Sequence, residues 1–484
     1  MKIFIVYRVL SLTSLIVSIS MFLPLGLALY DGAADGNAFI ISIFIGFLVS
    51  FSFFLLSLGD TDYKELGIKE AFAVVGFSWV AASAVGALPY ILSGVLPHYA
   101  GAFFEAMSGF TTTGTTAISD IESCPRSILF WRSLTIWFGG MGIIVFGLAI
   151  LPFLGVGGME LYKAEAPGPT HEKLTPRIHQ TALLLWGVYI FMTALQTILL
   201  MFGGMSLFDA TIHSFGTVAT GGFSTRNNSI AWYDSAYIDW VITIFLFLSG
   251  INFALHYKMA SGNFKGYFKD DEFRFYAVTI LICVIVTTLV LRFGGQYHNI
   301  FEALRFGAFQ VVSVVTTSGY ETANYEDWPY LIQFMLLLLM FLGGCAGSTS
   351  GGIKNIRVLI LCRSVRAEFK KILHPNAVTH IRVSDKVVPR EAVSSVMTFI
   401  MVFIFIFITA ALLMTSLGID TVTSLSSVAA ALCNIGIGFG LVRSAHNYEW
   451  MPDSAKWIMS FCMLAGRLEL YAVLMLFLPA TWKR

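Results

Sequence analysis

The string Thr111-Thr112-Thr113-Gly114-Thr115 has three relatives farther along the chain. They are Ala219-Thr220-Gly221-Gly222-Phe223, Thr316-Thr317-Ser318-Gly319-Tyr320 and Cys433-Asn434-Ile435-Gly436-Ile437. Their central glycines recur about every 100 residues, and recurrence at a near-constant interval indicates an internal repeat. Each string follows a short apolar stretch and lies between two long ones, so the chain is predicted to contain one structural unit four times.

The composition excludes a soluble protein. Of the 484 residues, 57% are hydrophobic and only 12% are charged, whereas soluble domains carry about 25% charged residues. The formal net charge of +1 provides no basic excess for binding nucleic acid. The six cysteines form no CxxC pair, which argues against a disulfide framework or a zinc site. A chain with this composition needs lipid as its solvent.

Ten stretches are long and apolar enough to cross a bilayer, for which a helix needs about 20 residues. They lie near residues 4–29, 37–59, 69–93, 128–155, 178–204, 237–260, 272–293, 328–361, 391–417 and 455–479. The shorter apolar stretches that precede the glycine strings lie near 98–113, 206–221, 299–318 and 420–435. Segments too short to span are candidates for re-entrant loops, whose bare backbone must line a cavity or be buried in protein.

The predicted fold is an all-α membrane protein in which two N-terminal helices precede four helix–pore loop–helix repeats around a central pore. The predicted divisions are an N-terminal two-helix hairpin at 1–60, pore repeats at 69–155, 178–260, 272–364 and 391–484, and a basic linker at 365–390. Lysine and arginine gather in the connections 156–177, 258–274 and 354–390, which fall on one side of the membrane. The positive-inside rule then predicts that both termini are cytoplasmic.

The glycine strings suit the binding of a dehydrated cation. A bare cation in the middle of a bilayer is costly, and rings of backbone carbonyls can replace its water shell. Glycine supplies the backbone angles that such rings demand, and the C-terminal end of each preceding short helix adds a negative dipole. The predicted filter and cation-binding residues are Thr112, Thr113, Gly114, Thr220, Gly221, Gly222, Thr317, Ser318, Gly319, Asn434, Ile435 and Gly436. The alternative is that these small residues only let helices pack closely.

The stretch 328–361 is too long for one straight span, and a glycine-rich run, 343–352, lies in its middle. Each glycine costs a helix about 1 kcal/mol relative to alanine, and interrupted membrane helices commonly line substrate paths. We therefore expect a flexible loop that obstructs the pore below the filter. Its predicted gate residues are Ala346, Gly347, Ser348, Thr349, Ser350, Gly351 and Gly352. A simple kink packed by neighbouring helices is the alternative.

Arg467 lies at the middle of the last predicted span, where an arginine costs roughly 2.5–3.5 kcal/mol on insertion scales. Glu469 is two positions farther on and faces a different side of the helix. Arg467 is therefore expected to face a cavity or a partner on another helix. A structural ion pair with a buried acid is the alternative to a role in the pore.

The four glycine strings and the string Gly466-Arg467-Leu468-Glu469 resemble the Trk/Ktr/HKT superfamily of potassium transporters, most closely its bacterial TrkH branch, over the whole chain. The resemblance implies four covalently joined units, each like one subunit of a potassium channel, with potassium at the filter positions. It also implies that Arg467 lies just inside the filter as part of the gate. The family's filter glycines correspond to Gly114, Gly222, Gly319 and Gly436, a set typical of potassium-preferring members. The fourth string has Ile437 where proline is expected.

The resemblance further implies a location in the bacterial inner membrane and a homodimer with one pore in each protomer. It implies a separate TrkA-like cytoplasmic subunit that binds NAD and ATP and controls opening. This chain contains no nucleotide-binding domain of its own, so potassium is the one ligand expected for it.

The expected function is potassium-selective uptake through a gated, channel-like pore. A proton- or sodium-coupled potassium symporter is the alternative, although the titratable candidates Glu105, Asp239 and Glu469 form no evident relay. A membrane-embedded enzyme would need a cluster of nucleophile and base or a metal set such as HExxH, and the sequence shows neither. We therefore expect no enzymatic activity.

Overall fold

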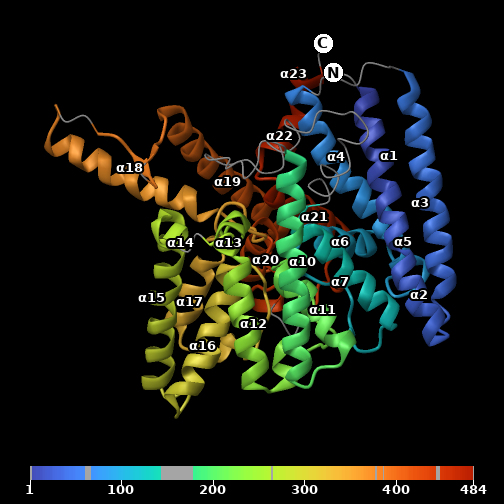
Figure 1. Cartoon of the computed structure of the whole chain (residues 1–484), viewed down its shortest axis with the longest axis horizontal. Coiled ribbons are helices and arrows are strands. Elements are labelled where there is room, and N and C mark those ends of the chain that lie inside the picture. The colour runs from blue at the N-terminus through green and yellow to red at the C-terminus, as the bar shows by residue number, and fades with distance from the viewer. Residues whose placement is uncertain are drawn as a thin grey trace.

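The computed structural model describes residues 3–59, 67–142, 178–262, 265–376, 379–384, 386–442 and 447–482. Within these ranges the elements are helices, apart from an antiparallel pair of two-residue strands, β1 (Arg382–Val383) and β2 (Lys386–Val387). The longest helices run in roughly one direction (Figure 1), as expected of a bundle that crosses a bilayer. The helix α18 (Asn355–Leu373) departs from this direction and projects from the bundle.

The N-terminal part packs through small residues. Its helices are α1 (Ile3–Ser20), α2 (Phe22–Asp31) and α3 (Gly36–Leu56). Ser50 Oγ on α3 donates to the carbonyl of Ser11 on α1 at 2.8 Å. A Cβ at Gly46 would overlap Ser18, and small residues of this kind let membrane helices approach closely.

In the described parts of the chain, six helices are long and apolar enough to cross a membrane, or seven if one bent pair of helices counts as a single span; ten spans were predicted for the whole chain. The six helices are Ile3–Asp31, Gly36–Leu56, Lys69–Leu92, Ala182–Phe202, Asp271–Phe293 and Arg390–Ser416. The corresponding elements after α3 are α4 (Ile68–Gly86) with α5 (Leu88–Leu92), α10 (Ile178–Phe202), α15 (Asp271–Phe293) and α19 (Arg390–Ser416). The four other predicted stretches are each interrupted or only partly described.

The stretch 237–260, predicted as one spanning helix, is broken into two helices. α12 (Ala236–Ser249) and α13 (Phe253–Ala260) meet at an angle of 99°. Gly250 ends α12, and the Asn252 side chain caps α13 by accepting a hydrogen bond from the amide of Ala254 at 2.9 Å. The break is therefore built with its own helix cap.

The prediction of an unbroken span at 455–479 is wrong. The chain forms α21 (Asp453–Arg467), α22 (Tyr471–Phe477) and α23 (Pro479–Trp482). Glu469 and Leu470 separate α21 from α22 with φ of 53° and 63°. These left-handed angles cannot continue a right-handed helix.

Two further predicted spans, 328–361 and 128–155, differ in how far the structure describes them. Residues 328–361 are interrupted as predicted, between α17 (Tyr330–Leu339) and α18. α7 (Arg126–Gly140) occupies the first part of 128–155, and residues 143–155 lie outside the described residues. The connection 156–177, which we predicted to be cytoplasmic, also lies outside them.

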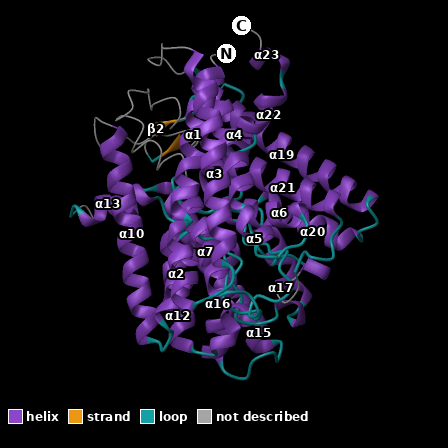
Figure 2. Ribbon diagram, turned by 90° about the vertical axis from the view of Figure 1, so that its right-hand side faces the viewer, coloured by secondary structure: helices purple, strands orange, loops and turns teal. Residues whose placement is uncertain are grey.

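A short helix precedes each glycine string. These helices are α6 (Tyr99–Phe110), α11 (Leu207–Val218), α16 (Ile300–Val315) and α20 (Thr421–Leu432). The side chains of Ser206, Asn299 and Asp420 cap three of them by accepting backbone hydrogen bonds. α6 lies inside the bundle against α7 and α21 (Figure 2), so its string starts in the protein interior. Shorter elements are α14 (Lys265–Lys269) and the 3-10 turns Ser57–Gly59, Ser229–Tyr233, Tyr325–Asp327 and Gly440–Val442.

Candidate functional site

The four glycine strings leave their short helices in the same backbone register. The amide of Thr112 donates to Gly109 O at 2.9 Å, and the amide of Thr113 donates to Ser108 O at 2.8 Å. The corresponding pairs of bonds, at 2.8–3.2 Å, are made by Thr220 and Gly221, by Thr317 and Ser318, and by Asn434 and Ile435. The glycines that occupy equivalent positions are therefore Gly114, Gly222, Gly319 and Gly436.

This register directs carbonyl oxygens away from the short helices. In a trans peptide, the C=O of one residue points opposite to the N–H of the next. Because the amides of Thr112 and Thr113 point back to α6, the carbonyls of Thr111 and Thr112 point away from it. The same holds for the other three strings, since their amides make the same bonds.

A left-handed backbone angle recurs two residues before each equivalent glycine. The φ angles are 54° for Thr112, 53° for Thr220, 59° for Thr317 and 55° for Asn434. Residues other than glycine seldom adopt this region. Such strain persists only where the surrounding structure imposes it, and it concentrates at functional sites.

The fourth string departs from the others at its glycine. Gly114, Gly222 and Gly319 have φ of 85°, 71° and 78°, whereas the φ of Gly436 lies outside the left-handed region. Beyond the buried Ile437, the hydroxyl of Tyr325 donates to Gly438 O, and Ser426 Oγ donates to Phe439 O at 2.8 Å. The segment that lacks the expected proline is thus held by side chains on its outer side.

The four strings contact one another in cyclic order at their glycines. A Cβ at Gly114 would overlap the carbonyl oxygen of Gly221, and a Cβ at Gly222 would overlap that of Ser318. A Cβ at Gly319 would lie 2.8 Å from the nitrogen of Gly436. A Cβ at Gly436 would lie 3.0 Å from the carbonyl group of Gly114, which closes the circle. The glycines are therefore gathered about one place, and side chains are excluded from it.

The segments that follow the strings are linked in the same cyclic order. The hydrogen bonds run from Ile121 N to Asn227 Oδ1 (2.9 Å), Ala231 N to Glu321 O (3.0 Å), Gly440 N to Glu326 Oε1 (2.9 Å) and Tyr448 N to Thr116 O (2.8 Å). The Asn227 amide also donates to Asp120 at 2.8 Å, and this hydrogen bond lowers the pKa of that carboxyl. A negative charge is thus maintained beside the first and second strings.

A buried ion pair lies behind the first and second strings. Arg132 Nε is 2.6 Å from Glu105 Oε1, and both side chains are almost fully buried. Glu105 accepts from the amide of Ala117 at 2.7 Å, while Arg132 donates to Ser224 O at 3.1 Å. The pair therefore ties the two strings together. The sequence analysis noted Glu105 but missed Arg132, although an arginine inside an apolar stretch was a usable signal.

The interruption between α17 and α18 forms a loop with a closed neck. The amide of Gly343 donates to Ile353 O at 2.9 Å, and the amide of Asn355 donates to Gly344 O at 3.1 Å. Residues 345–352 extend from this neck towards the glycine strings. The predicted gate residues therefore form one compact loop, and α18 begins directly after it.

This loop directly contacts the second, third and fourth glycine strings. Thr220 Oγ1 donates to Thr349 Oγ1 at 3.3 Å, and the amide of Gly351 donates to Thr317 Oγ1 at 2.7 Å. A Cβ at Gly351 would overlap the carbonyl of Cys433 in the fourth string. The first string is reached through Arg467, as described next.

Arg467 ends α21 and bridges the loop to the first string. Nη1 donates to Thr349 O at 2.7 Å and to Thr112 Oγ1 at 3.1 Å. Nη2 donates to Gly139 O at 2.6 Å. Arg467 was expected to face either a cavity or a partner on another helix. It has partners on other elements.

Other charges hold the loop from the side of α18 and α15. Lys354 Nζ donates to Ser350 O. Glu272 Oε1 accepts from the amide of Ala346 at 2.7 Å and from that of Ile356 at 2.9 Å. Glu272 thus joins the loop to the first turn of α18. The sequence analysis missed this residue because it lies 74 and 84 positions from its two partners, beyond the reach of local patterns.

The three carboxylates considered for a proton relay are all paired with arginine. Glu105 pairs with Arg132 at 2.6 Å, Asp239 pairs with Arg305 at 2.6 Å, and Glu469 pairs with Arg357. Among the described residues, no group of three or more histidine, cysteine, aspartate or glutamate side chains could hold a metal ion. The strings themselves present carbonyl and hydroxyl oxygens and the side-chain amide of Asn434, which donates to Thr113 Oγ1 at 3.0 Å.

Known proteins are similar to this chain in sequence and in architecture. The family model for TrkH, described as a cation transport protein, matches residues 39–484. The Trk system potassium uptake proteins TrkH of Salmonella typhimurium and Escherichia coli are each 41% identical over 480 residues, which cover 98% of this chain and 98% of each relative. The potassium uptake protein TrkG of Escherichia coli is 36% identical and covers 91% of this chain and 92% of its own length. The crystal structure of the potassium transporter TrkH from Vibrio parahaemolyticus matches with a TM-score of 0.90, 36% identity and 100% coverage of both chains.

Proposed function

The chain belongs to the TrkH family of cation transport proteins, and we propose from this premise that it takes up potassium selectively through a gated, channel-like pore. Its relatives are transporters rather than enzymes. Its apolar helices make it a multi-pass protein, and the bacterial inner membrane is its location. Both termini are proposed to be cytoplasmic, in line with the positive-inside rule.

The cyclic contact of the four glycine strings carries this proposal. The four strings share one register, point carbonyls away from their helices and exclude side chains where they meet. Four equivalent loops around one axis would form a pseudo-fourfold filter in which carbonyl oxygens replace the water shell of potassium. The proposed ligands are the backbone oxygens of 112–114, 220–222, 317–319 and 434–436.

The loop 346–352 is proposed as the gate. Its support is its direct contact with three strings, its link to the first through Arg467, and its neck of backbone hydrogen bonds, which would let it move as a unit. Arg467 would act in two ways. Its charge would oppose a cation below the filter, and its hydrogen bond to Thr349 O would hold the loop in place.

Control from the cytoplasm is proposed to act through α18. This helix begins just after the proposed gate loop and projects from the bundle (Figure 1). Its sequence includes the basic residues Arg366, Lys370 and Lys371. A TrkA-like regulatory subunit that binds NAD and ATP would pull or release the loop through such a helix. A homodimer with one pore in each protomer completes the proposed assembly.

A coupled symporter is disfavoured by the pairing of its candidate carboxylates. Glu105, Asp239 and Glu469 each face an arginine, and ion-paired carboxylates are poor acceptors for a proton that must move along a path. A channel-like pore needs no such relay.

Uptake and electrical recording together test the proposal. The chain should restore growth of a potassium-uptake-deficient bacterium at low potassium. The purified protein in planar bilayers should then pass a current that reverses near the potassium equilibrium potential under opposed potassium and sodium gradients. A reversal potential that follows the proton or sodium gradient would establish symport instead, and the absence of both rescue and current would refute potassium uptake.

A further inference from the structure

The residue after each filter glycine has its carbonyl tied back in three of the four strings. Ser108 Oγ donates to Thr115 O at 2.6 Å in the first string, and Ser313 Oγ donates to Tyr320 O at 2.7 Å in the third. Both serines occupy the same position on their short helices, six residues before the glycine. The first and third strings thus each use a hydroxyl of their own helix to fix the second peptide after the glycine.

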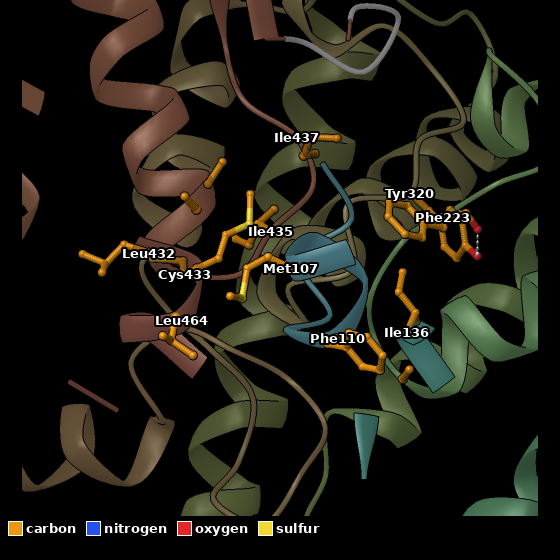
Figure 3. Packing of buried hydrophobic residues seen from close by; sticks show 14 of the residues in the cluster. Met107, Phe110, Ile136, Phe223, Tyr320, Leu432, Cys433, Ile435, Ile437 and Leu464 are labelled. Atoms are coloured by element: carbon orange, nitrogen blue, oxygen red, sulfur yellow. Dashed lines mark hydrogen bonds between the residues drawn. The ribbon is translucent and has the colours of Figure 1, made fainter. Parts of the chain in front are cut away.

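The second string lacks this serine because its helix has Gly216 at that position. The hydroxyl of Tyr320, from the third string, donates to Phe223 O at 2.9 Å instead (Figure 3). A Cβ at Gly216 would overlap this hydroxyl. Gly216 therefore opens the notch through which a side chain of the neighbouring string reaches the second one.

From this geometry we propose that Tyr320 is a positioning residue that sets the cation selectivity of the filter. The inference rests on the proposed function, since it assigns a role within that filter. Tyr320 and Phe223 are fully buried, so water does not compete for their hydrogen bond. Fixing the Phe223 carbonyl limits rotation of the preceding peptide, whose oxygen belongs to Gly222. In the snug-fit account of potassium selectivity, a filter that cannot contract around a smaller ion discriminates against sodium.

Tyr320 also connects two strings that are otherwise separate in sequence. Its own carbonyl is held by Ser313 while its hydroxyl holds Phe223. A displacement of the third string would therefore be passed to the second. In the fourth string the corresponding helix residue is Ala430, which has no hydroxyl to donate. The hydroxyl that holds the carbonyl after the glycine thus differs from string to string. Tyr320 supplies it to the second string, which neighbours its own.

The first test is Tyr320→Phe, measured as the permeability ratio of potassium to sodium from reversal potentials. This ratio does not depend on how many molecules fold, so a loss of expression leaves it unchanged. We expect it to fall about fivefold, the effect of one lost neutral hydrogen bond. The matched control is Tyr276→Phe, which removes a buried hydroxyl that donates to Phe247 O at 3.0 Å beside Gly250. Its ratio should equal that of the wild type.

The second test is a rescue by a second substitution. Tyr320→Leu should lower the ratio and leave space in the notch, and addition of Gly216→Ser should restore most of it by supplying the hydroxyl that Ser108 and Ser313 supply elsewhere. An unchanged ratio in Tyr320→Phe, an equal loss in Tyr276→Phe, or no recovery in the double variant would overturn the inference. A wild-type protein that passes potassium and sodium equally would refute the proposed function itself.

Discussion

Arg467 Nη1 donates a hydrogen bond of 2.7 Å to the carbonyl oxygen of Thr349, although the two residues belong to different parts of the chain. The same nitrogen reaches Thr112 Oγ1 at 3.1 Å. One guanidinium therefore contacts both the proposed gate loop and the proposed filter. This position accounts for an arginine whose insertion into a membrane is costly, because the side chain finds carbonyl and hydroxyl partners in the protein.

Replacing Arg467 should favour the open pore. Hydrogen bonds to charged groups contribute about 1.5–3 kcal/mol, so Arg467→Gln should raise the ratio of open to closed states by about tenfold to hundredfold. Single-channel recording of open probability measures this directly. Arg467→Lys serves as the control, because it keeps the charge but loses the planar donor pair. A barrier that is purely electrostatic would leave conductance low in Arg467→Lys and raise it in Arg467→Gln, whereas no change in either variant would remove Arg467 from the gate.

Deleting residues 346–351 should raise potassium flux several-fold in cells. The neck of the loop is already closed by hydrogen bonds from Gly343 to Ile353 and from Asn355 to Gly344, so the remaining chain ends lie close together. The deletion removes the contacts to the strings while leaving α17 and α18 in place. Uptake of rubidium tracer under matched expression is the measurement. Flux equal to that of the intact chain would show that the loop does not obstruct the path.

The glycine strings were predictable because their signal is local and recurs. The sequence alone identified Gly114, Gly222, Gly319 and Gly436 as equivalent, and the interrupted helix around 343–352 could be recognised from its glycines. The structure added the cyclic contacts, which depend on how distant segments pack.

The bend at Gly250 could not be read from its own sequence. The stretch 237–260 is apolar enough for a straight helix. The proposed gate loop, which packs into the bend, lies about 100 residues later in the chain, beyond the reach of local patterns. There the amide of Cys345 donates to Gly250 O at 2.8 Å, and the amide of Phe253 donates to Gly347 O at 3.0 Å. At the bend, backbone groups form hydrogen bonds with a remote loop in place of helical ones. Local periodicity in the sequence cannot predict such contacts.

Substitutions of glycine should differ in effect according to their surroundings. Gly222→Ala should abolish potassium uptake, because the new Cβ combines a left-handed φ of 71° with an overlap onto Ser318 O. Gly436→Ala should retain part of the uptake, since its φ is not left-handed and its nearest neighbour is 3.0 Å away. Complementation of a potassium-uptake-deficient strain over a series of potassium concentrations measures this order.

Gly94→Ala is the control for backbone strain alone. Gly94 has a φ of 78°, yet no atom lies within 4 Å of the Cβ that alanine would add. The left-handed angle costs an alanine about 1–2 kcal/mol. Alanine at position 94 would therefore carry the same kind of backbone strain as alanine at position 222. Uptake should therefore persist in Gly94→Ala. If Gly94→Ala and Gly222→Ala lost uptake equally, backbone strain would explain the need for glycine at position 222, and obstruction of the proposed filter would not.

The buried pair of Glu105 and Arg132 should make a large contribution to stability. Removing one partner of a buried ion pair costs about 3–5 kcal/mol, because the other charge is left without compensation. Arg132→Gln should therefore lower the midpoint of thermal unfolding in detergent by several degrees, as followed by size-exclusion chromatography of heated samples. The exposed pair of Arg126 and Asp31, at 3.1 Å with Arg126 49% exposed, is the matched control. Exposed pairs contribute about 1 kcal/mol or less, so Arg126→Gln should leave the midpoint nearly unchanged. Equal midpoints for the two variants would show that the link between the first and second strings does not depend on this pair.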